Sequence, residues 1–280
     1  MLLFRFFCLP QTTTLRRFFF FCRLNTFICV TASSEKYEEE LEWIRAGIEE
    51  KGRSMKKVVI YVNSIAMCER LYIWFSSSLN EKAYDGSKTI EHRLVEMYHA
   101  HTDADSKERI MSDFCRSDGY IKVLVATVAV GMGIDICDIT VIVIWGLPPS
   151  LLQLWQEAGR CGRDGRESIA VTYAFPRSIA LPCNNCRKQG KSVCTCQNRS
   201  YLKQLVSTSD CQRAYILQSF SLNKENEKEL HDLKNKKGCS GTCTDICRCS
   251  LCTCCRVCLQ SCKCPKHNES MKQQILFYLN

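Results

Sequence analysis

The chain has 280 residues, of which 46% are hydrophobic and 24% charged, a composition that suits one or two globular domains and argues against disorder throughout. Its net charge of +9 is concentrated in residues 177–280, which hold 17 Lys and Arg against 7 Asp and Glu, whereas residues 1–176 hold 21 against 22. Of its 22 cysteines, 15 lie between Cys183 and Cys264. The last third is therefore expected to be a separate, basic, cysteine-rich region, and its charge favours an anionic partner such as nucleic acid.

Residues 1–36 are expected to be a leader without regular structure. The first 32 residues contain four arginines, many aromatic residues and no acidic residue, a composition loosely like that of a mitochondrial transit peptide. An organelle signal is therefore the alternative to an unstructured leader. The arginines and Pro10 keep every apolar run well below the roughly 18 residues that a membrane-spanning helix needs, so no membrane partner is expected.

From residue 37 onward the hydrophobic pattern alternates between strands and helices. The run KKVVIYV at residues 56–62 is short, apolar and β-branched, which is typical of a buried strand. It is followed by apolar residues at helical spacing, namely Ile65, Cys68, Leu71, Tyr72, Phe75 and Leu79. A second helix is expected to open at Asp105, with Glu108 completing a capping box, and a third at Ser150, with Gln153 in the same role.

Three further apolar runs read as strands, at residues 121–127, 140–145 and 168–175. Short strands that are apolar on both faces and alternate with helices indicate an α/β fold with a parallel sheet and helices on both sides. In such sheets the ligand site lies at the carboxyl ends of the strands. The glycine-rich segment VATVAVGMGID at residues 125–135 leaves such an end, and its backbone can approach a phosphate closely.

A second motif, QEAGRCGRDG, spans residues 156–165 at the end of the third helix. If that helix persists to Arg163, Arg160 and Arg163 share one face, and we expect the motif to face the region of residues 125–135. Two guanidinium groups that point the same way suit a polyphosphate. The alternative is a solvated helix end with surface ion pairs.

These two motifs, in this order and spacing, resemble motifs V and VI of the second motor lobe of superfamily 2 helicases, and the wording of the second is that of the RecQ family. VVIYVNS at residues 58–64 resembles motif IV, and MYHA at residues 97–100 resembles a strand that precedes a conserved turn of the family. CQRAYILQSF at residues 211–220 resembles the start of the RecQ zinc-binding region. The resemblance implies a RecA-like lobe at residues 37–176 and a zinc-binding region at residues 177–280.

The resemblance also implies roles for individual residues. Arg163 would be the arginine finger that reaches the γ-phosphate of ATP on the other lobe, and Arg160 would join it in binding nucleotide. Gln156 would link the lobes, and Asp135 would lie near the nucleotide. The positions that would approach the nucleic-acid backbone are Thr127 and Gly131.

Two positions depart from the family pattern, because Val130 stands where the family usually has Phe and His101 where it usually has Gly. The 280 residues also contain no GxxxxGK[ST] loop and no Asp-Glu pair, which an ATPase needs to hold phosphates and Mg²⁺. ATP and Mg²⁺ are therefore expected to be bound mainly by a first motor lobe that is missing from this chain. We expect the chain alone to be inactive.

Cysteine spacing predicts zinc sites in the last third. Cys249, Cys252, Cys255 and Cys258 repeat at intervals of three, and Cys183-x2-Cys186 is followed by Cys194-x-Cys196. Further candidate ligands are Cys239, Cys243, Cys247, Cys262, Cys264 and His267. Zinc is favoured over disulfides because no convincing secretory signal places the chain in an oxidising compartment. By resemblance to RecQ, Cys211 would share one zinc ion with Cys252, Cys255 and Cys258.

Two functions stay open. The first is part of an ATP-dependent 3′-to-5′ DNA helicase of RecQ type, which acts on single-stranded or forked DNA in repair, recombination or replication, in the nucleus or alternatively the mitochondrion. The second is a non-catalytic, zinc-stabilised protein derived from a helicase that binds nucleic acid or another protein. A metal-buffering protein is a weaker third possibility, since it leaves the two glycine-rich motifs unexplained.

Overall fold

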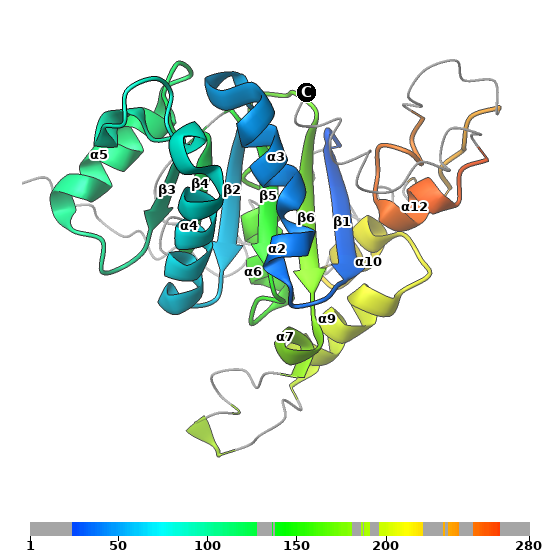
Figure 1. Ribbon diagram of the computed structural model, residues 1–280. Coiled ribbons are helices and arrows are strands. Elements are labelled where there is room, and N and C mark those ends of the chain that lie inside the picture. The colour runs from blue at the N-terminus through cyan, green and yellow to red at the C-terminus, as the bar shows by residue number, and fades with distance from the viewer. Residues whose placement is uncertain are drawn as a thin grey trace, which may run out of the picture.

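The computed structural model describes residues 24–127, 136, 138–180, 186, 188–190, 196–220, 232, 235–240 and 249–263. Its centre is a six-stranded sheet in which every pair of neighbouring strands is parallel (Figure 1). The strands lie in the order β1-β6-β5-β2-β4-β3. Their bounds are β1 Thr26–Ala32, β2 Lys57–Val62, β3 Val95–Tyr98, β4 Val123–Thr127, β5 Ile139–Trp145 and β6 Ser168–Ala174.

Helices connect the strands and cover both faces of the sheet. The α-helices described are α2 Tyr37–Glu40, α3 Glu42–Lys51, α4 Ile65–Leu79, α5 Ala104–Cys115, α6 Leu151–Ala158, α7 Pro176–Ala180, α9 Gln197–Ser207, α10 Gln212–Gln218 and α12 Arg256–Gln260. Short 3₁₀ turns are η1 Gly52–Ser54, η2 Asn80–Ala83 and η3 Ile90–His92. No described helix is long and apolar enough to cross a membrane.

Two hydrophobic clusters form the core, one on each face of the sheet. Buried side chains of α3 and α4, such as Ile44 and Phe75, pack on one face together with Ile60 of β2. Side chains of α5, α6, α9 and α10 pack on the other face, where Phe114 and Tyr61 belong to the same cluster. Alternate residues of a buried strand point to opposite faces, which is why these strands are apolar at every position. The RecA-like parallel sheet flanked by helices is thereby confirmed.

The elements expected from the sequence occur close to their predicted bounds, and one helix start differs. Helix α5 begins at Ala104, and its N-cap is Asp103, whose carboxylate accepts a hydrogen bond from the Ser106 amide at 2.8 Å. The predicted cap at Asp105 was therefore wrong by two residues. Asp103 and Asp105 are both suitable N-cap residues, and the helix uses the earlier one. Ser150 caps α6 as expected and accepts from the Gln153 amide at 3.2 Å.

The expectation that residues 1–36 lack regular structure was wrong for β1. Residues 26–32 pair with residues 168–174 of β6 in parallel register, and Phe27 to Val30 are buried. TFICVTA is a β-branched apolar run, but the arginine-rich composition around it pointed instead to a leader. The sheet of the lobe thus begins at Thr26, before the boundary predicted at residue 37.

The free edge of β1 is closed by residues from the cysteine-rich region. The Val30 amide donates to Gln212 Oε1 at 3.1 Å, and Gln212 Nε2 donates to the Val30 carbonyl at 2.7 Å. The Ile28 amide donates to the Cys254 carbonyl at 3.1 Å. Arg256 Nε also donates to the Val30 carbonyl at 3.2 Å. An edge strand needs such partners when it is buried, so the expected separate region is packed directly onto the sheet.

We predict that Gln212→Ala destabilises the fold, because it removes both hydrogen bonds to the buried Val30 backbone. The free energy of unfolding should fall by about 1–3 kcal/mol, measured by urea unfolding. Gln204→Ala is the control, since it removes only an exposed hydrogen bond from the Tyr215 hydroxyl. That variant should change stability by less than about 0.5 kcal/mol. Equal losses in both variants would show that Gln212 does not stabilise this edge.

Candidate functional site

The arginine motif lies in a turn that joins α6 to β6. Helix α6 ends at Ala158, and the amide of its C-cap Gly159 bonds back to the Trp155 carbonyl at 2.9 Å. The condition for both arginines to share one helix face, that the helix persists to Arg163, is therefore not met. Gly159 caps the end of the helix and Gly162 adopts a positive φ, so Arg160 and Arg163 are positioned by a turn.

Gly162 fixes the path of this turn. Its φ of +66° lies in the left-handed region, and a Cβ there would meet Asn25 Nδ2 at 2.7 Å and would also collide with Ser168 Oγ. Asn25 Nδ2 donates to the Gly162 carbonyl at 2.9 Å, and the Gly162 amide donates to the Ile139 carbonyl at 3.0 Å. Ile139 and Ser168 begin β5 and β6, so the backbone of the turn lies at the amino ends of these strands. Residues 128–135 lie outside the described residues, so the expectation that the arginine motif faces them stays a prediction.

The side chains of Arg160 and Arg163 nevertheless act on a common neighbour. Both residues are half-buried, and their Nε atoms are out of contact with solvent. Burial raises the pKa of Tyr61 well above its usual range, and the positive charges of Arg160 and Arg163 partly offset that rise. Tyr61 lies in the second half of β2, so both guanidiniums exert their fields on the same part of one sheet face. Gln156, by contrast, is exposed on α6.

Glu157 is a buried carboxyl beside the motif that the sequence analysis did not single out. It is 5% exposed, and Gln153 Nε2 donates to its Oε1 at 2.9 Å. Burial raises the pKa of Glu157 to about 7, against the lowering effects of the Gln153 hydrogen bond and the Arg160 charge. The sequence signal for a buried Glu157 was its place in an amphipathic helix. Its spacing puts this charged residue on the apolar face, together with Leu154 and Ala158.

The glycine-rich motif is described only at its start. Thr127 is the last residue of β4, where it is half-buried at the carboxyl end of the strand, as expected. Gly131, Asp135 and the departing position Val130 lie outside the described residues. Their expected roles therefore stay predictions.

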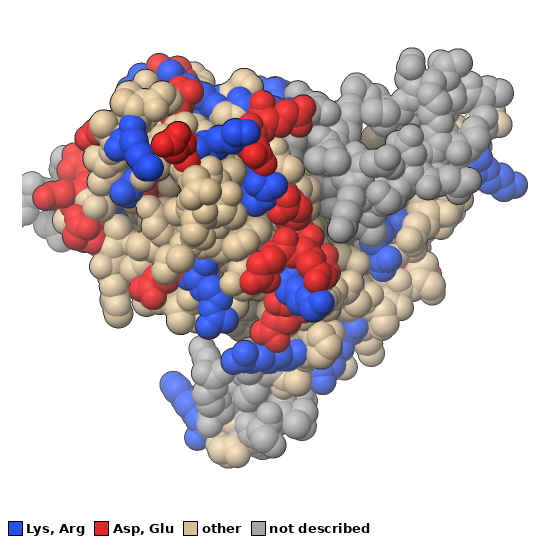
Figure 2. Space-filling view, viewed as in Figure 1, with Lys and Arg blue, Asp and Glu red and all other residues tan. Residues whose placement is uncertain are grey.

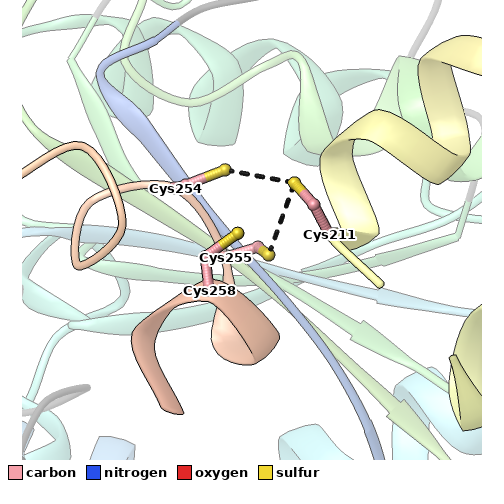
Figure 3. A group of neighbouring side chains, drawn as sticks. All are labelled: Cys211, Cys254, Cys255 and Cys258. Atoms are coloured by element: carbon pink, nitrogen blue, oxygen red, sulfur yellow. Dashed lines mark hydrogen bonds between the residues drawn. The ribbon is translucent and has the colours of Figure 1, made fainter. Parts of the chain in front are cut away.

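Four cysteine thiols meet where the cysteine-rich region covers β1. The sulfur atoms of Cys211, Cys254, Cys255 and Cys258 all lie within 4.8 Å of one another. Figure 3 shows Cys211 at the start of α10, Cys254 and Cys255 just before α12, and Cys258 within α12. Cys211 Sγ is 3.5 Å from Cys254 Sγ and 3.9 Å from Cys255 Sγ. Tetrahedral zinc with bonds of about 2.3 Å places its sulfurs about 3.8 Å apart, so this group can hold such a metal ion.

The structure brings together three of the four cysteines expected to share a zinc ion. Cys252 is not in this group, and Cys254 takes the place predicted for it beside Cys211, Cys255 and Cys258. Cys252 Sγ lies instead 3.3 Å from Cys249 Sγ. The regular spacing of three led to Cys252, whereas the hydrogen bond from the Ile28 amide to the Cys254 carbonyl turns the segment toward β1 at Cys254.

Basic side chains surround the four thiols. Arg213 is 1% exposed and donates to the carbonyls of Thr26 and Cys254, and Lys236 Nζ donates to Cys254 Sγ. Hydrogen bonds within the group, led by the one with Cys211, and the charge of Arg213 hold the pKa of Cys254 well below its usual range. The hydrogen bond with Cys211 likewise helps to lower the pKa of Cys255 to about 6. A buried guanidinium needs nearby negative charge, which metal-bound thiolates supply.

The other predicted ligands are described in part. Cys186 Sγ and Cys196 Sγ lie 3.3 Å apart, so the structure brings this expected pair together. Cys183 and Cys194 lie outside the described residues.

Known proteins resemble the chain over the same elements. Residues 39–165 match the family described as the helicase conserved C-terminal domain. The ATP-dependent DNA helicase hus2/rqh1 of Schizosaccharomyces pombe is 26% identical over 231 residues, which are 80% of this chain and 15% of that protein. The ATP-dependent DNA helicase RecQ of Haemophilus influenzae is 32% identical over 146 residues, or 52% and 21% of the two chains. The ATP-dependent DNA helicase Q4 of Mus musculus is 37% identical over 88 residues, or 31% and 7%.

Residues 39–165 therefore match the C-terminal domain of helicases. The relatives named as ATP-dependent DNA helicases, RecQ of Haemophilus influenzae among them, support a lobe of the RecQ type. The chain spans between 7% and 21% of the length of these three relatives.

Solved structures of DEAD-box proteins show a partial likeness. The Mss116p DEAD-box helicase domain 2 bound to an RNA duplex has a TM-score of 0.44 at 14% identity and covers 74% of this chain and 79% of that one. Dbp5 of S. cerevisiae bound to RNA and ADP BeF3 has a TM-score of 0.43 at 20% identity and covers 56% and 37%.

We predict that Glu157 makes the protein less stable as the pH rises. An unfolded glutamate loses its proton near pH 4.5, whereas buried Glu157 keeps it up to about pH 7. The unfolded state is therefore favoured progressively across that window, by up to about 3 kcal/mol, and no further above it. Glu157→Gln cannot ionise and should lose this dependence, so its advantage over the wild type should grow between pH 5 and pH 8.

The measurement is urea unfolding of both proteins at the two pH values, with Glu167→Gln, an exposed glutamate of the same turn, as the control. A constant difference between Glu157→Gln and the wild type at pH 5 and pH 8 would show that Glu157 titrates normally.

Proposed function

We propose that the chain supplies the second motor lobe and the zinc-binding region of an ATP-dependent 3′-to-5′ DNA helicase. The observation that carries this proposal is the match of residues 39–165 to the helicase C-terminal domain, which includes Arg160 and Arg163 at the turn of Gly162. The turn lies within the residues that match the helicase C-terminal domain. Relatives over this region are named as ATP-dependent DNA helicases, which supports the same activity here.

In this proposal the arginines complete an ATP site built mainly by a first motor lobe that also holds Mg²⁺. Arg163 reaches the γ-phosphate and stabilises the charge that develops during hydrolysis, and Arg160 contacts the same nucleotide. Gln156, exposed on α6, is placed to contact the first lobe. Closing and opening of the two lobes then moves the bound strand stepwise.

The DNA strand is proposed to pass near Thr127, together with Gly131 and the segment that leads to Asp135. Thr127 ends β4 at the edge where ligands of parallel sheets bind. The face over α2 and α3 is an unlikely path, because Figure 2 shows acidic side chains gathered there, among them Glu38, Glu39, Glu40 and Glu42. A phosphate backbone is repelled by such a surface.

The four thiols of Cys211, Cys254, Cys255 and Cys258 are proposed to bind one Zn²⁺ ion as a structural site. The ion would tie the start of α10 to the segment before α12, and both flank β1. We further propose action on single-stranded or forked DNA in repair, recombination or replication, in the nucleus or alternatively in the mitochondrion.

A non-catalytic role is the second candidate, and a sequence observation favours it. The 280 residues contain neither the GxxxxGK[ST] loop nor the acidic pair of an ATPase. A chain that acts by itself would then bind nucleic acid or a protein partner through the same lobe, without hydrolysing ATP.

We predict that Arg163→Ala lowers DNA-stimulated ATP hydrolysis by about 10³-fold or more, because arginine fingers contribute about 10³ to 10⁵ in rate. The assay uses the natural polypeptide that carries this lobe, tagged at its genomic locus, so that any first motor lobe is included. Arg166→Ala is the control, since Arg166 is exposed and its Nε bonds to Asp164 Oδ2 at 2.6 Å. Its rate should stay within about twofold, a difference of roughly 0.4 kcal/mol.

The isolated 280-residue chain should show no DNA-stimulated ATP hydrolysis. Turnover by this chain that Arg163→Ala abolishes would contradict the division of the ATP site between two lobes. A natural polypeptide without any ATP hydrolysis would support the non-catalytic alternative.

We also predict that the chain binds single-stranded DNA weakly and that binding falls steeply with salt. Contacts to the phosphate backbone release counterions, so the logarithm of the binding constant should fall linearly with the logarithm of salt concentration. Fluorescence anisotropy with a labelled oligonucleotide between 50 and 200 mM salt, roughly the range over which such binding weakens, measures the slope. Binding that does not respond to salt would rule out a groove that follows the phosphate backbone.

A further inference from the structure

A second group of thiols lies in the same short segment as the first. Cys239, Cys249 and Cys262 have sulfur atoms that all lie within 4.8 Å of one another. Cys262 Sγ is 3.7 Å from both Cys239 Sγ and Cys249 Sγ. Cys252, which neither set of mutually close sulfurs includes, has its sulfur 3.3 Å from Cys249 Sγ. This second thiol group therefore has three converging sulfurs and a fourth beside them.

The two groups divide the cysteines of one segment between two sides of the sheet. Cys254, Cys255 and Cys258 belong to the core cluster on the face of α6 and α9. Cys252 and Cys262 belong to the cluster on the face of α3 and α4, and Cys239 and Cys249 pack against that cluster. The segment thus presents two sets of three sulfurs, and each set is completed by a cysteine from an earlier part of the chain.

The local chain is shaped to bring these sulfurs together. Ser250 Oγ donates to the Lys237 carbonyl at 3.1 Å, which holds residues 235–240 beside the start of the segment. A Cβ on Gly238 would meet Leu251 Cδ1 at 3.2 Å and Cys262 Sγ at 3.5 Å, so a glycine here lets the backbone approach the thiols. Beyond α12, the Cys262 amide bonds to the Leu259 carbonyl at 3.1 Å and turns Cys262 back toward Cys249.

The distances fit metal ligation and do not fit disulfides. A disulfide needs sulfurs about 2.05 Å apart. The sulfurs of this group are separated by 3.3 to 3.7 Å along the measured edges. Sulfurs bound to one tetrahedral zinc ion stand about 3.8 Å apart. Two of the four, Cys252 and Cys262, are buried, and buried thiolates are stabilised when they share a cation.

We propose that Cys239, Cys249, Cys252 and Cys262 bind a second Zn²⁺ ion, separate from the ion of the first group. The chain then carries two interleaved thiolate sites, in which the segment of residues 249–262 gives three ligands to each. One ion fastens this segment toward the face of α3 and α4 and the other toward the opposite face. The role of the second ion is structural, because four protein thiolates leave no open coordination position.

The test is the zinc content of the full chain and its variants, measured by native mass spectrometry. Cys262→Ser and Cys258→Ser should each lose one ion relative to the wild type, and the double variant should lose two. Cys115→Ser, at an exposed position on α5, is the control and should keep the wild-type content. Differences are compared because other cysteines of the chain can bind further ions.

The proposal is overturned if Cys262→Ser keeps the wild-type zinc content, or if the two single variants and the double variant all lose the same single ion. A second measurement covers variants that do not fold. In the zinc-loaded wild type, alkylation by iodoacetamide should be slow at Cys239, Cys249, Cys252 and Cys262 and fast at Cys115, and zinc removal should abolish the difference. Equal rates at all five positions in the zinc-loaded protein would also overturn it. Neither readout depends on ATP hydrolysis or DNA binding, so both tests stand apart from the proposed helicase function.

Discussion

The hydrogen bonds along the outer edge of β1 are the constraint on which the rest of the structure depends. Val30 and Ile28 are buried, so their backbone groups need partners inside the protein. Those partners are Gln212, Arg256 and the Cys254 carbonyl, all from a region that lies far away in the sequence. The lobe and the cysteine-rich region are thereby joined along β1, in addition to the apolar packing of α9 and α10 on one face of the sheet.

The residues that bond to the edge of β1 are sequence neighbours of cysteines in the first thiol group. Gln212 and Arg213, which bond to β1, directly follow Cys211, and Arg256 directly follows Cys255. A metal ion that holds Cys211 and Cys255 also holds the side chains that close the sheet. Ligand binding energy in such a site is folding energy, so it is available to stabilise the edge of β1. The cysteine-rich region would then stabilise the edge of the lobe's sheet, in addition to forming a structural unit of its own.

The sequence allowed the central sheet to be predicted because buried parallel strands are apolar at every position. Strands β2, β4, β5 and β6 stand out by this pattern, and β1 shares it. Strand β1 was missed because the composition of the residues before it was given more weight than its own β-branched run. Cys254 was missed because ligand choice depends on how the backbone turns at β1, which a regular spacing of three does not contain.

The arginine motif is a second case in which residue spacing does not determine the backbone conformation. A spacing of three is compatible both with one helix face and with a turn, and the sequence favoured the helix. The glycines decide against it, because Gly159 ends α6 and Gly162 adopts a φ that a helix excludes. Both arrangements place the guanidiniums on one side, but only the turn is anchored by Asn25, which directly precedes β1. The strand that the cysteine-rich region covers on its outer edge is thus also the strand that begins beside the arginine turn, so the edge next to the four thiols and the arginines are parts of one continuous structure.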